Sequence, residues 1–170
     1  MDIHRKFGPD QDASIIQTVQ RAFAKRRPPA HFTNFEHCEE CAEYDAILRS
    51  RDIYSLRIED VGNAGSDPIC FISPEGFAYY LPALVRLALA EPAEPYDWYG
   101  AQLLFHLCSD GLRNERVLAC SIQQRRAVVA FLRHLIETRS ELADIYGCSD
   151  ELFQAIEYWS DETFSPKSGD

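Results

Sequence analysis

The chain has 170 residues, of which 46% are hydrophobic and 26% charged, and its net charge is −10. A chain of this length and composition buries a core in one globular domain without disulfides or metal, which excludes a wholly disordered protein. After residue 30 the chain has 24 acidic and 11 basic residues, a balance that argues against nucleic acid as a partner and favours a basic protein.

The sequence contains no segment of the kind that directs a protein into or across a membrane. No stretch approaches the roughly 18 apolar residues that span a bilayer, and the first residues form no apolar secretion signal. We therefore expect a cytoplasmic protein. In a reducing compartment its six cysteines remain thiols or bind metal instead of forming a disulfide framework.

The first predicted helix covers residues 12–25. Apolar side chains recur there every four residues, at Ile15, Val19 and Phe23, which is the spacing of one helix face. The helix must end before Pro28, because proline excludes the helical conformation for the residue that precedes it.

The next part of the chain is predicted to contain a helix, two short strands and a loop. The helix covers residues 34–49. Residues 53–58 alternate weakly between apolar and polar, and residues 69–72 are mostly apolar, so each is interpreted as a short strand. In the Gly-rich loop between them, Asp60 and Asn63 are expected to make turn hydrogen bonds.

A helix is predicted from Ser73 to about Ala90. Ser73 is a favourable N-cap, Pro74 fits the first helical position, and Glu75 places an acid in the first turn. Pro82 lies inside this helix and is expected to kink it or to split it in two.

Three more helices are predicted towards the C-terminal end. One covers residues 96–108. The longest opens at the capping box that Ser121 and Gln124 form and runs to about Ile145, and the last begins at Ser149.

The predicted elements indicate a mainly α protein with about six helices and at most a small two-stranded β element. We expect a single compact helical domain over residues 1–160. Residues 161–170 are polar without periodicity and are expected to form a disordered tail.

The strongest candidate for a site is the run His37-Cys38-Glu39-Glu40-Cys41. Two thiolates separated by two residues can close on one metal ion, and an adjacent imidazole suits the same borderline ion, for which zinc is the default. A structural zinc site has four ligands, however, and only three are present here. The remote candidates for a fourth ligand are Cys70, His106 and Cys108.

Two other interpretations of Cys38 and Cys41 stay open. The pair can cycle between dithiol and disulfide, as expected of a thiol oxidoreductase, although the surrounding glutamates disfavour a thiolate. The two cysteines can also serve as small apolar side chains on the buried face of a helix. Of the remaining histidines, His106 is expected in the core or at its boundary and His134 at the surface.

Four stretches of the chain together resemble a known family. They are Glu-His-Cys-Glu-Glu-Cys at 36–41, Glu-Asp-Val-Gly-Asn at 59–63, Asp-Pro-Ile-Cys-Phe-Ile-Ser-Pro-Glu-Gly-Phe-Ala-Tyr-Tyr-Leu-Pro at 67–82 and Leu-Phe-His-Leu at 104–107. They resemble a family of small bacterial proteins of unknown function. The resemblance implies a bacterial cytoplasmic origin and no particular reaction, and the helix that begins in the third stretch is similar to that of some immunity or partner proteins.

The sequence alone therefore favours a non-enzymatic acidic interaction protein, immunity-like or regulatory, that binds a basic partner protein. The negative charge and the lack of a recognisable catalytic constellation support this interpretation. The alternatives are a zinc-binding protein that uses His37, Cys38 and Cys41, and a thiol oxidoreductase that uses the two cysteines.

Overall fold

A computed structural model describes residues 9–163, and within this range the protein is helical without a strand. The described α-helices are α1 (Pro9–Phe23), α2 (Glu39–Arg49), α3 (Ile58–Val61), α4 (Pro74–Leu89), α5 (Tyr99–Cys108), α6 (Glu115–Leu118), α7 (Ile122–Ile145) and α8 (Ser149–Ser160). Short 3-10 helices cover Ala64–Ser66, Pro68–Cys70 and Gly111–Arg113. The prediction of a mainly α protein with one compact domain is confirmed.

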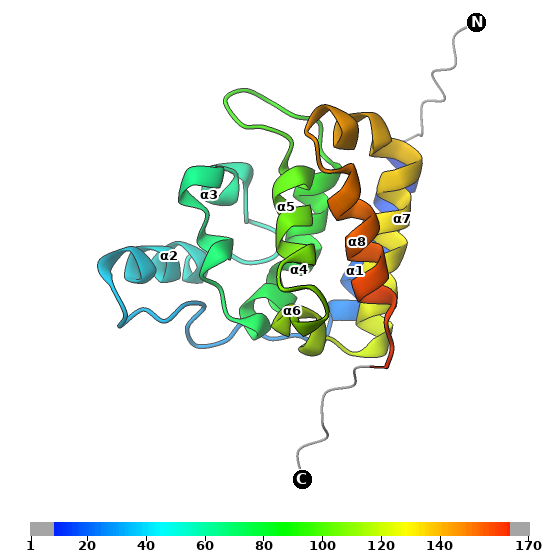
Figure 1. The fold of residues 1–170 in the computed structure, drawn as a ribbon. Coiled ribbons are helices and arrows are strands. Elements are labelled where there is room, and N and C mark those ends of the chain that lie inside the picture. The colour runs from blue at the N-terminus through cyan, green and yellow to red at the C-terminus, as the bar shows by residue number, and fades with distance from the viewer. Residues whose placement is uncertain (1–8, 164–170) are drawn as a thin grey trace, which may run out of the picture.

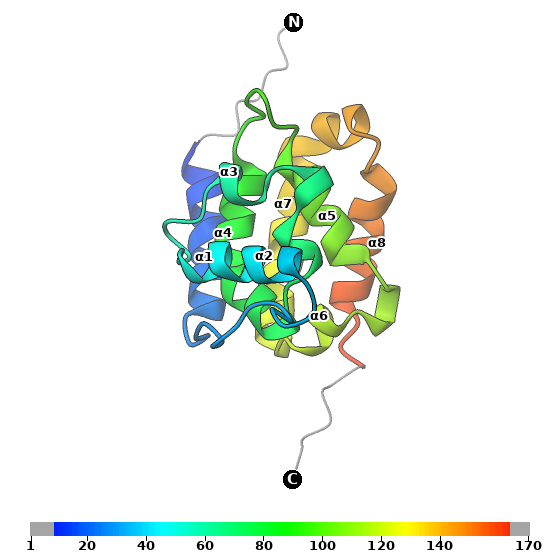
Figure 2. The same ribbon diagram turned by 90° about the vertical axis from the view of Figure 1, so that its left-hand side faces the viewer.

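Helices α1, α4, α5, α7 and α8 form one body (Figure 1). The elements from α2 to the 3-10 helix Pro68–Cys70 form a second layer beside it. Helix α1 packs against α4 and α7, α5 packs against α4 and α8, and α7 packs against α8. Figure 2 shows α2 lying across the face of this body that includes α4. The elements from α2 to the second 3-10 helix therefore cover one side of the bundle.

Helix α4 is the centre of the core, and its ends lie where the sequence places them. The Ser73 hydroxyl accepts a hydrogen bond from the N–H of Gly76 at 3.1 Å, which caps the first turn. The expectation that Pro82 splits this helix in two is wrong, because α4 runs unbroken to Leu89. Pro82 is buried in the middle of the helix, and the packing of its neighbours maintains the helix there.

The two expected strands are wrong. Around residues 53–58 the carboxylate of Asp52 accepts hydrogen bonds from the N–H groups of Tyr54 and Ser55, which folds the chain into a turn. The segment 69–72 begins with a 3-10 turn, because Asp67 caps it by accepting from the N–H of Ile69 at 2.9 Å. Side chain to backbone hydrogen bonds thus compete successfully with strand pairing.

The ends of the described chain bear on two further expectations. Glu162 forms an ion pair with Arg126 at 2.7 Å, and Thr163 donates to Asp161, so residues 161–163 make defined contacts. The rest of the expected tail, residues 164–170, lies outside the described residues. None of the described helices combines the length and the apolar composition needed to cross a bilayer.

Candidate functional site

The run from His37 to Cys41 lies at the start of α2 and brings its three donor atoms together. Cys38 is the N-cap of α2, and its sulfur accepts a hydrogen bond from the N–H of Cys41 at 3.4 Å. The imidazole Nδ1 of His37 lies 3.8 Å from the sulfur of Cys41. All three donor atoms lie within 4.8 Å of one another, so the structure gathers the residues that the sequence singles out.

The helix begins at Glu39, five residues later than the predicted start at residue 34, and this shift makes the cluster. Neighbouring residues within an α-helix point about 100° apart. His37 and Cys38 precede the first helical turn, so this rotation does not direct their side chains away from each other. The backbone of Cys38 is extended, and its side chain turns back over the N–H groups of the first turn. The residues are thus arranged as a loop followed by a helix N-terminus.

The two cysteines differ in exposure. The Cys38 side chain is exposed, whereas Cys41 is buried with 4% of its surface accessible. The expectation that both cysteines pack on a buried helix face is therefore wrong for Cys38, because this residue precedes the helix. Only Cys41 packs beneath the loop.

The thiols also differ in acidity. The hydrogen bond from the Cys41 N–H holds the pKa of the Cys38 thiol below its usual value. The contact with Cys38 raises the pKa of the Cys41 thiol, and burial and the nearby Glu40 carboxylate act in the same direction. Cys38 is therefore the more acidic and the more accessible thiol of the pair.

The loop that carries His37 is tied to α2 by a buried carboxylate. Asp45 accepts hydrogen bonds from the N–H of Phe32 at 2.6 Å and from the N–H of Thr33 at 3.2 Å. The Thr33 hydroxyl donates to the carbonyl of Cys41 at 2.6 Å. Asp45 also lies 2.7 Å from Nδ1 of His31. These contacts support the cluster from behind, although none of these side chains is among its three donors.

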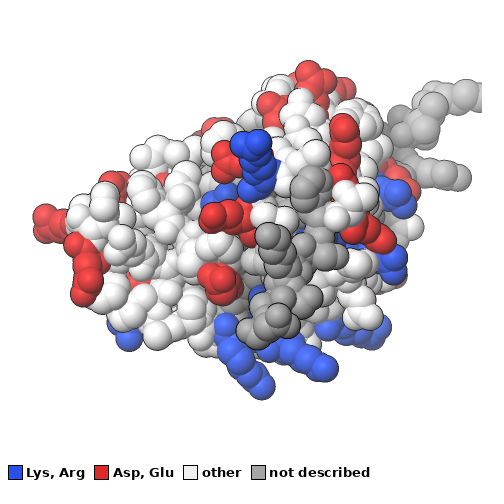
Figure 3. Space-filling view, turned by 60° about the horizontal axis from the view of Figure 1, so that its bottom comes forward, with Lys and Arg blue, Asp and Glu red and all other residues white. Residues whose placement is uncertain are grey.

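Four exposed glutamates surround the site, at positions 36, 39, 40 and 43. Acidic side chains also gather over the end of the molecule that α2 forms (Figure 3). This charge attracts cations towards the loop.

The remote ligand candidates do not join this cluster. Cys70 and His106 instead form a separate group with Asp67, whose donor atoms also lie within 4.8 Å of one another. Cys108 belongs to neither group, and its thiol donates to the carbonyl of Phe105 at 3.8 Å. Residue spacing does not connect Asp67 to Cys70 and His106, because Asp67 and His106 lie 39 residues apart.

His106 and His134 are both buried. His106 is buried with 1% exposure, as expected. The expectation for His134 is wrong, because it is buried with 6% exposure and its Nε2 lies 2.6 Å from Asp12 on α1. The partner is 122 residues away, so local sequence around His134 carries no sign of it.

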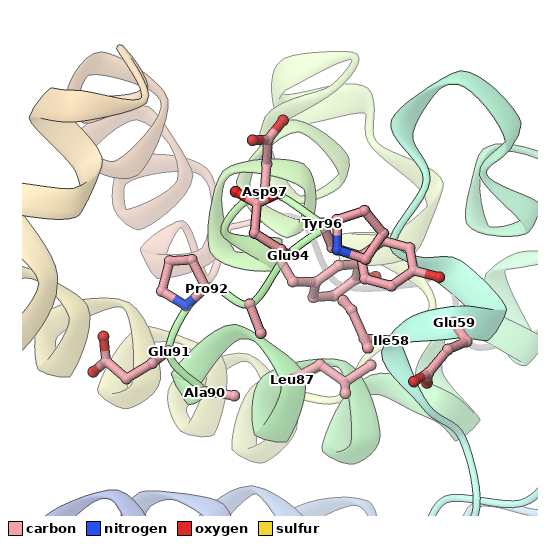
Figure 4. A pocket seen from close by; sticks show the side chains of 12 residues that line it. Ile58, Glu59, Leu87, Ala90, Glu91, Pro92, Glu94, Tyr96 and Asp97 are labelled. Atoms are coloured by element: carbon pink, nitrogen blue, oxygen red, sulfur yellow. The ribbon is translucent and has the colours of Figure 1, made fainter.

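A pocket of about 400 Å³ lies between α3, the end of α4 and the loop before α5. Figure 4 shows Leu87 and Ala90 on the helix side and Tyr96 over Ile58, with carboxylates directed outward around them. The acidic lining residues are Glu59, Glu91, Glu94 and Asp97. No lining residue is basic, so an apolar floor has a uniformly negative rim.

Comparison with known proteins places the chain in a protein family. A model of a family of unknown function, DUF6714, matches residues 11–163. The chain belongs to this family. No curated protein and no solved structure matches it. DUF6714 is a family of unknown function, so membership assigns no reaction to this chain.

Proposed function

We propose that this protein binds zinc through His37, Cys38 and Cys41. The observation that carries the proposal is the mutual distance of the three donor atoms, all within 4.8 Å. At zinc bond lengths of about 2.3 Å to sulfur and 2.1 Å to nitrogen, tetrahedral ligands lie about 3.6 Å apart. The 3.8 Å between Nδ1 of His37 and the sulfur of Cys41 is close to that value.

The surroundings supply what such a site needs. The N–H of Cys41 donates to the sulfur of Cys38 and so stabilises it as a thiolate, the form that binds metal. Asp45 fixes the loop that carries His37. Three protein ligands leave one coordination position open, and the exposure of His37 and Cys38 directs that position to solvent. The ion would thus be accessible to a water molecule or to a group from a partner.

The test is the metal content of the reduced, purified protein, measured by plasma mass spectrometry before and after exposure to Zn²⁺. Cys38→Ser and Cys41→Ser should each lower the zinc affinity by at least about 10-fold. Cys108→Ser is the matched control, because that thiol belongs to neither donor group, and it should leave the zinc content unchanged. A wild-type protein that takes up no zinc, or one whose uptake the first two variants leave intact, would contradict the proposal.

The same experiment addresses thiol redox chemistry. If Cys38 and Cys41 form a disulfide reversibly, and reduced protein takes up no zinc, the oxidoreductase alternative replaces the metal site. The difference in accessibility and acidity between the two thiols is the observation that favours this alternative.

A second candidate function is binding of a basic segment of another protein at the pocket before α5. Four carboxylates around an apolar floor match a lysine or arginine side chain, whose aliphatic stem packs on apolar surface while its charge stays at the rim. A neighbouring hollow shares Glu59, Tyr96 and Asp97 with this pocket, so the acidic surface continues past a single side chain.

This function is tested with a labelled Lys/Arg-rich peptide in a fluorescence polarisation titration. Binding should weaken on Glu94→Gln with Asp97→Asn and at high salt, because the attraction is screened. Glu137→Gln with Glu141→Gln, on the exposed face of α7, is the control for net charge. Equal loss in both double variants would mean attraction to overall charge only, and would contradict a specific site.

A further inference from the structure

A second group of donors lies between the turn Pro68–Cys70 and α5. Asp67 and His106 are buried with 4% and 1% exposure, and Oδ2 of Asp67 lies 2.6 Å from Nε2 of His106. The amide of Gln102 donates to the same oxygen at 2.7 Å. Cys70 is exposed, and its sulfur lies within 4.8 Å of donor atoms of Asp67 and His106. A carboxylate, an imidazole and a thiol thus meet at one point.

The local fold explains why these residues meet. Asp67 caps the 3-10 turn that ends at Cys70, and residues three apart in such a turn lie on the same side. Gln102 and His106 are four apart on α5, so they share the helix face that contacts Asp67. The amide of Asn114 donates to the carbonyl of His106 at 3.1 Å and holds the end of that helix.

Tyr99 provides an independent observation at the same place. Its side chain is 2% exposed, and its hydroxyl has no hydrogen-bond partner among residues 9–163. Tyr99 lies three residues before Gln102 on α5, so its side chain is on the face of the helix that carries Gln102 and His106. A buried hydroxyl without a partner is unfavourable, and a ligand at this point would relieve that cost.

A pocket of about 440 Å³ opens beside Cys70, which is the one donor of the cluster among its lining residues. Two basic and two acidic residues also line this pocket: Arg113, Arg116, Asp110 and Glu115. Arg116 donates to the carbonyl of Ile69 at 3.1 Å and stacks over Phe77, so its positive charge is fixed there. An ion at the cluster would have its open coordination position on the side of this pocket, where a water molecule or a group from a partner could complete its coordination.

We propose that Asp67, Cys70 and His106 form a second site for a divalent ion of the zinc class. Oxygen, nitrogen and sulfur donors together suit a borderline ion such as Zn²⁺ better than Ca²⁺ or Mg²⁺, which take oxygen ligands. Oδ2 of Asp67 and Nε2 of His106 lie 2.6 Å apart. An oxygen and a nitrogen that bind the same tetrahedral zinc ion lie about 3.3 Å apart. The ion therefore replaces the proton that the pair shares, and the two side chains separate by roughly 0.7 Å.

The pair formed by Asp12 and His134 resembles the pair of Asp67 and His106 but has no thiol beside it within the described chain. Its Nε2–Oδ1 distance is also 2.6 Å and its imidazole is also buried, but it belongs to no group of three donors among the described residues. Arg139 completes that pair instead. If a buried aspartate–histidine pair sufficed to bind zinc, both pairs would do so, whereas the proposal assigns binding to the pair that has a thiol beside it.

The experiment uses the full chain with the first donor group removed. Cys38→Ser with Cys41→Ser should still bind about one Zn²⁺ or Co²⁺ per chain, with one thiolate-to-cobalt absorption contribution. Adding Cys70→Ser, at an exposed residue whose change spares the core, should abolish that absorption and reduce the affinity at least about 10-fold. Adding Cys108→Ser instead should change neither.

The outcomes separate this proposal from the proposed function. If wild-type protein binds one ion that Cys70→Ser removes and Cys38→Ser with Cys41→Ser does not, the second site stands and the first fails. If Cys38→Ser with Cys41→Ser abolishes all binding, or if adding Cys70→Ser to it leaves the metal affinity unchanged, the second site is overturned. His134→Asn in the same background should retain the ion, and its loss there would also overturn the assignment.

Discussion

The carboxylate of Asp12 lies 2.6 Å from Nε2 of His134 and thereby joins the start of α1 to the middle of α7. Its other oxygen accepts from Arg139 at 2.7 Å, and the same arginine nitrogen donates to the carbonyl of Leu89 at the end of α4. One carboxylate at the bundle surface therefore holds three long helices together through two nearly buried partners.

Asp12→Asn should lower the free energy of unfolding by about 2–3 kcal/mol at pH 7, because it leaves a buried arginine without its counter-charge. Urea unfolding followed by circular dichroism measures this change. Asp10→Asn is the matched control, since Asp10 lies in the same first turn of α1 and is exposed. A loss of the same size in both variants would assign the effect to the helix dipole instead.

The stability that Asp12 contributes should depend on pH. Burial raises the pKa of this carboxyl, but the hydrogen bonds from Arg139 and His134 outweigh burial and hold it below its usual value. A depressed folded-state pKa means that the contribution is present above about pH 4 and is lost as pH falls through the folded-state value. The difference between wild type and Asp12→Asn should therefore shrink in acid, and a difference constant down to pH 2 would contradict this account.

Gly100→Ala should be one of the most damaging single substitutions in the chain. A β-carbon there would lie 2.1 Å from Cζ2 of Trp98, whose indole is buried and donates to the carbonyl of Ala88. We expect a loss of about 3 kcal/mol or failure to fold, because the ring has no room to move. Gly65→Ala, where the nearest atom is 3.4 Å away at an exposed turn, should change the melting temperature little.

Two buried tyrosines should respond in opposite directions to loss of their hydroxyls. The Tyr80 hydroxyl donates to the carbonyl of Leu48, so Tyr80→Phe should cost about 1–2 kcal/mol. The Tyr99 hydroxyl has no partner in the described part of the chain, so Tyr99→Phe in metal-free protein should be neutral or stabilise by up to about 1 kcal/mol. Thermal unfolding of both variants in a chelator decides this, and equal destabilisation would mean that Tyr99 has a partner in solution.

Local sequence was sufficient for the parts of the fold that local hydrogen bonds determine. The N-caps Ser73 and Ser121, and Gln124 that completes the capping box of Ser121, are where the pattern places them. The start of α2 could not be placed in this way. Asp45 binds the N–H groups of Phe32 and Thr33 and holds the preceding loop out of the helix.

The two candidate metal sites differ in whether local sequence can identify their donors. His37, Cys38 and Cys41 are within five residues, so their spacing alone identified them. Asp67 and His106 are 39 residues apart, and only the packing of α5 against the preceding turns brings them together. Residue spacing contains no information on such a pair without the tertiary fold.

Asp45→Ala should weaken zinc binding at the first cluster although Asp45 is not one of the three donors. The variant leaves two buried backbone N–H groups without an acceptor and frees the loop that places His37. We expect a loss of about 2–4 kcal/mol in stability and about a 10-fold fall in zinc affinity, as for other residues that orient metal ligands.

Zinc competition with a chromophoric chelator measures the affinity change, at a temperature where the variant is still folded by circular dichroism. Asp52→Ala is the control, because that carboxylate also accepts two backbone N–H groups but holds an exposed turn after α2. It should reduce stability without changing zinc affinity. If Asp45→Ala binds zinc as tightly as wild type, the loop before α2 does not need this anchor, and His37 either places itself or is not a ligand.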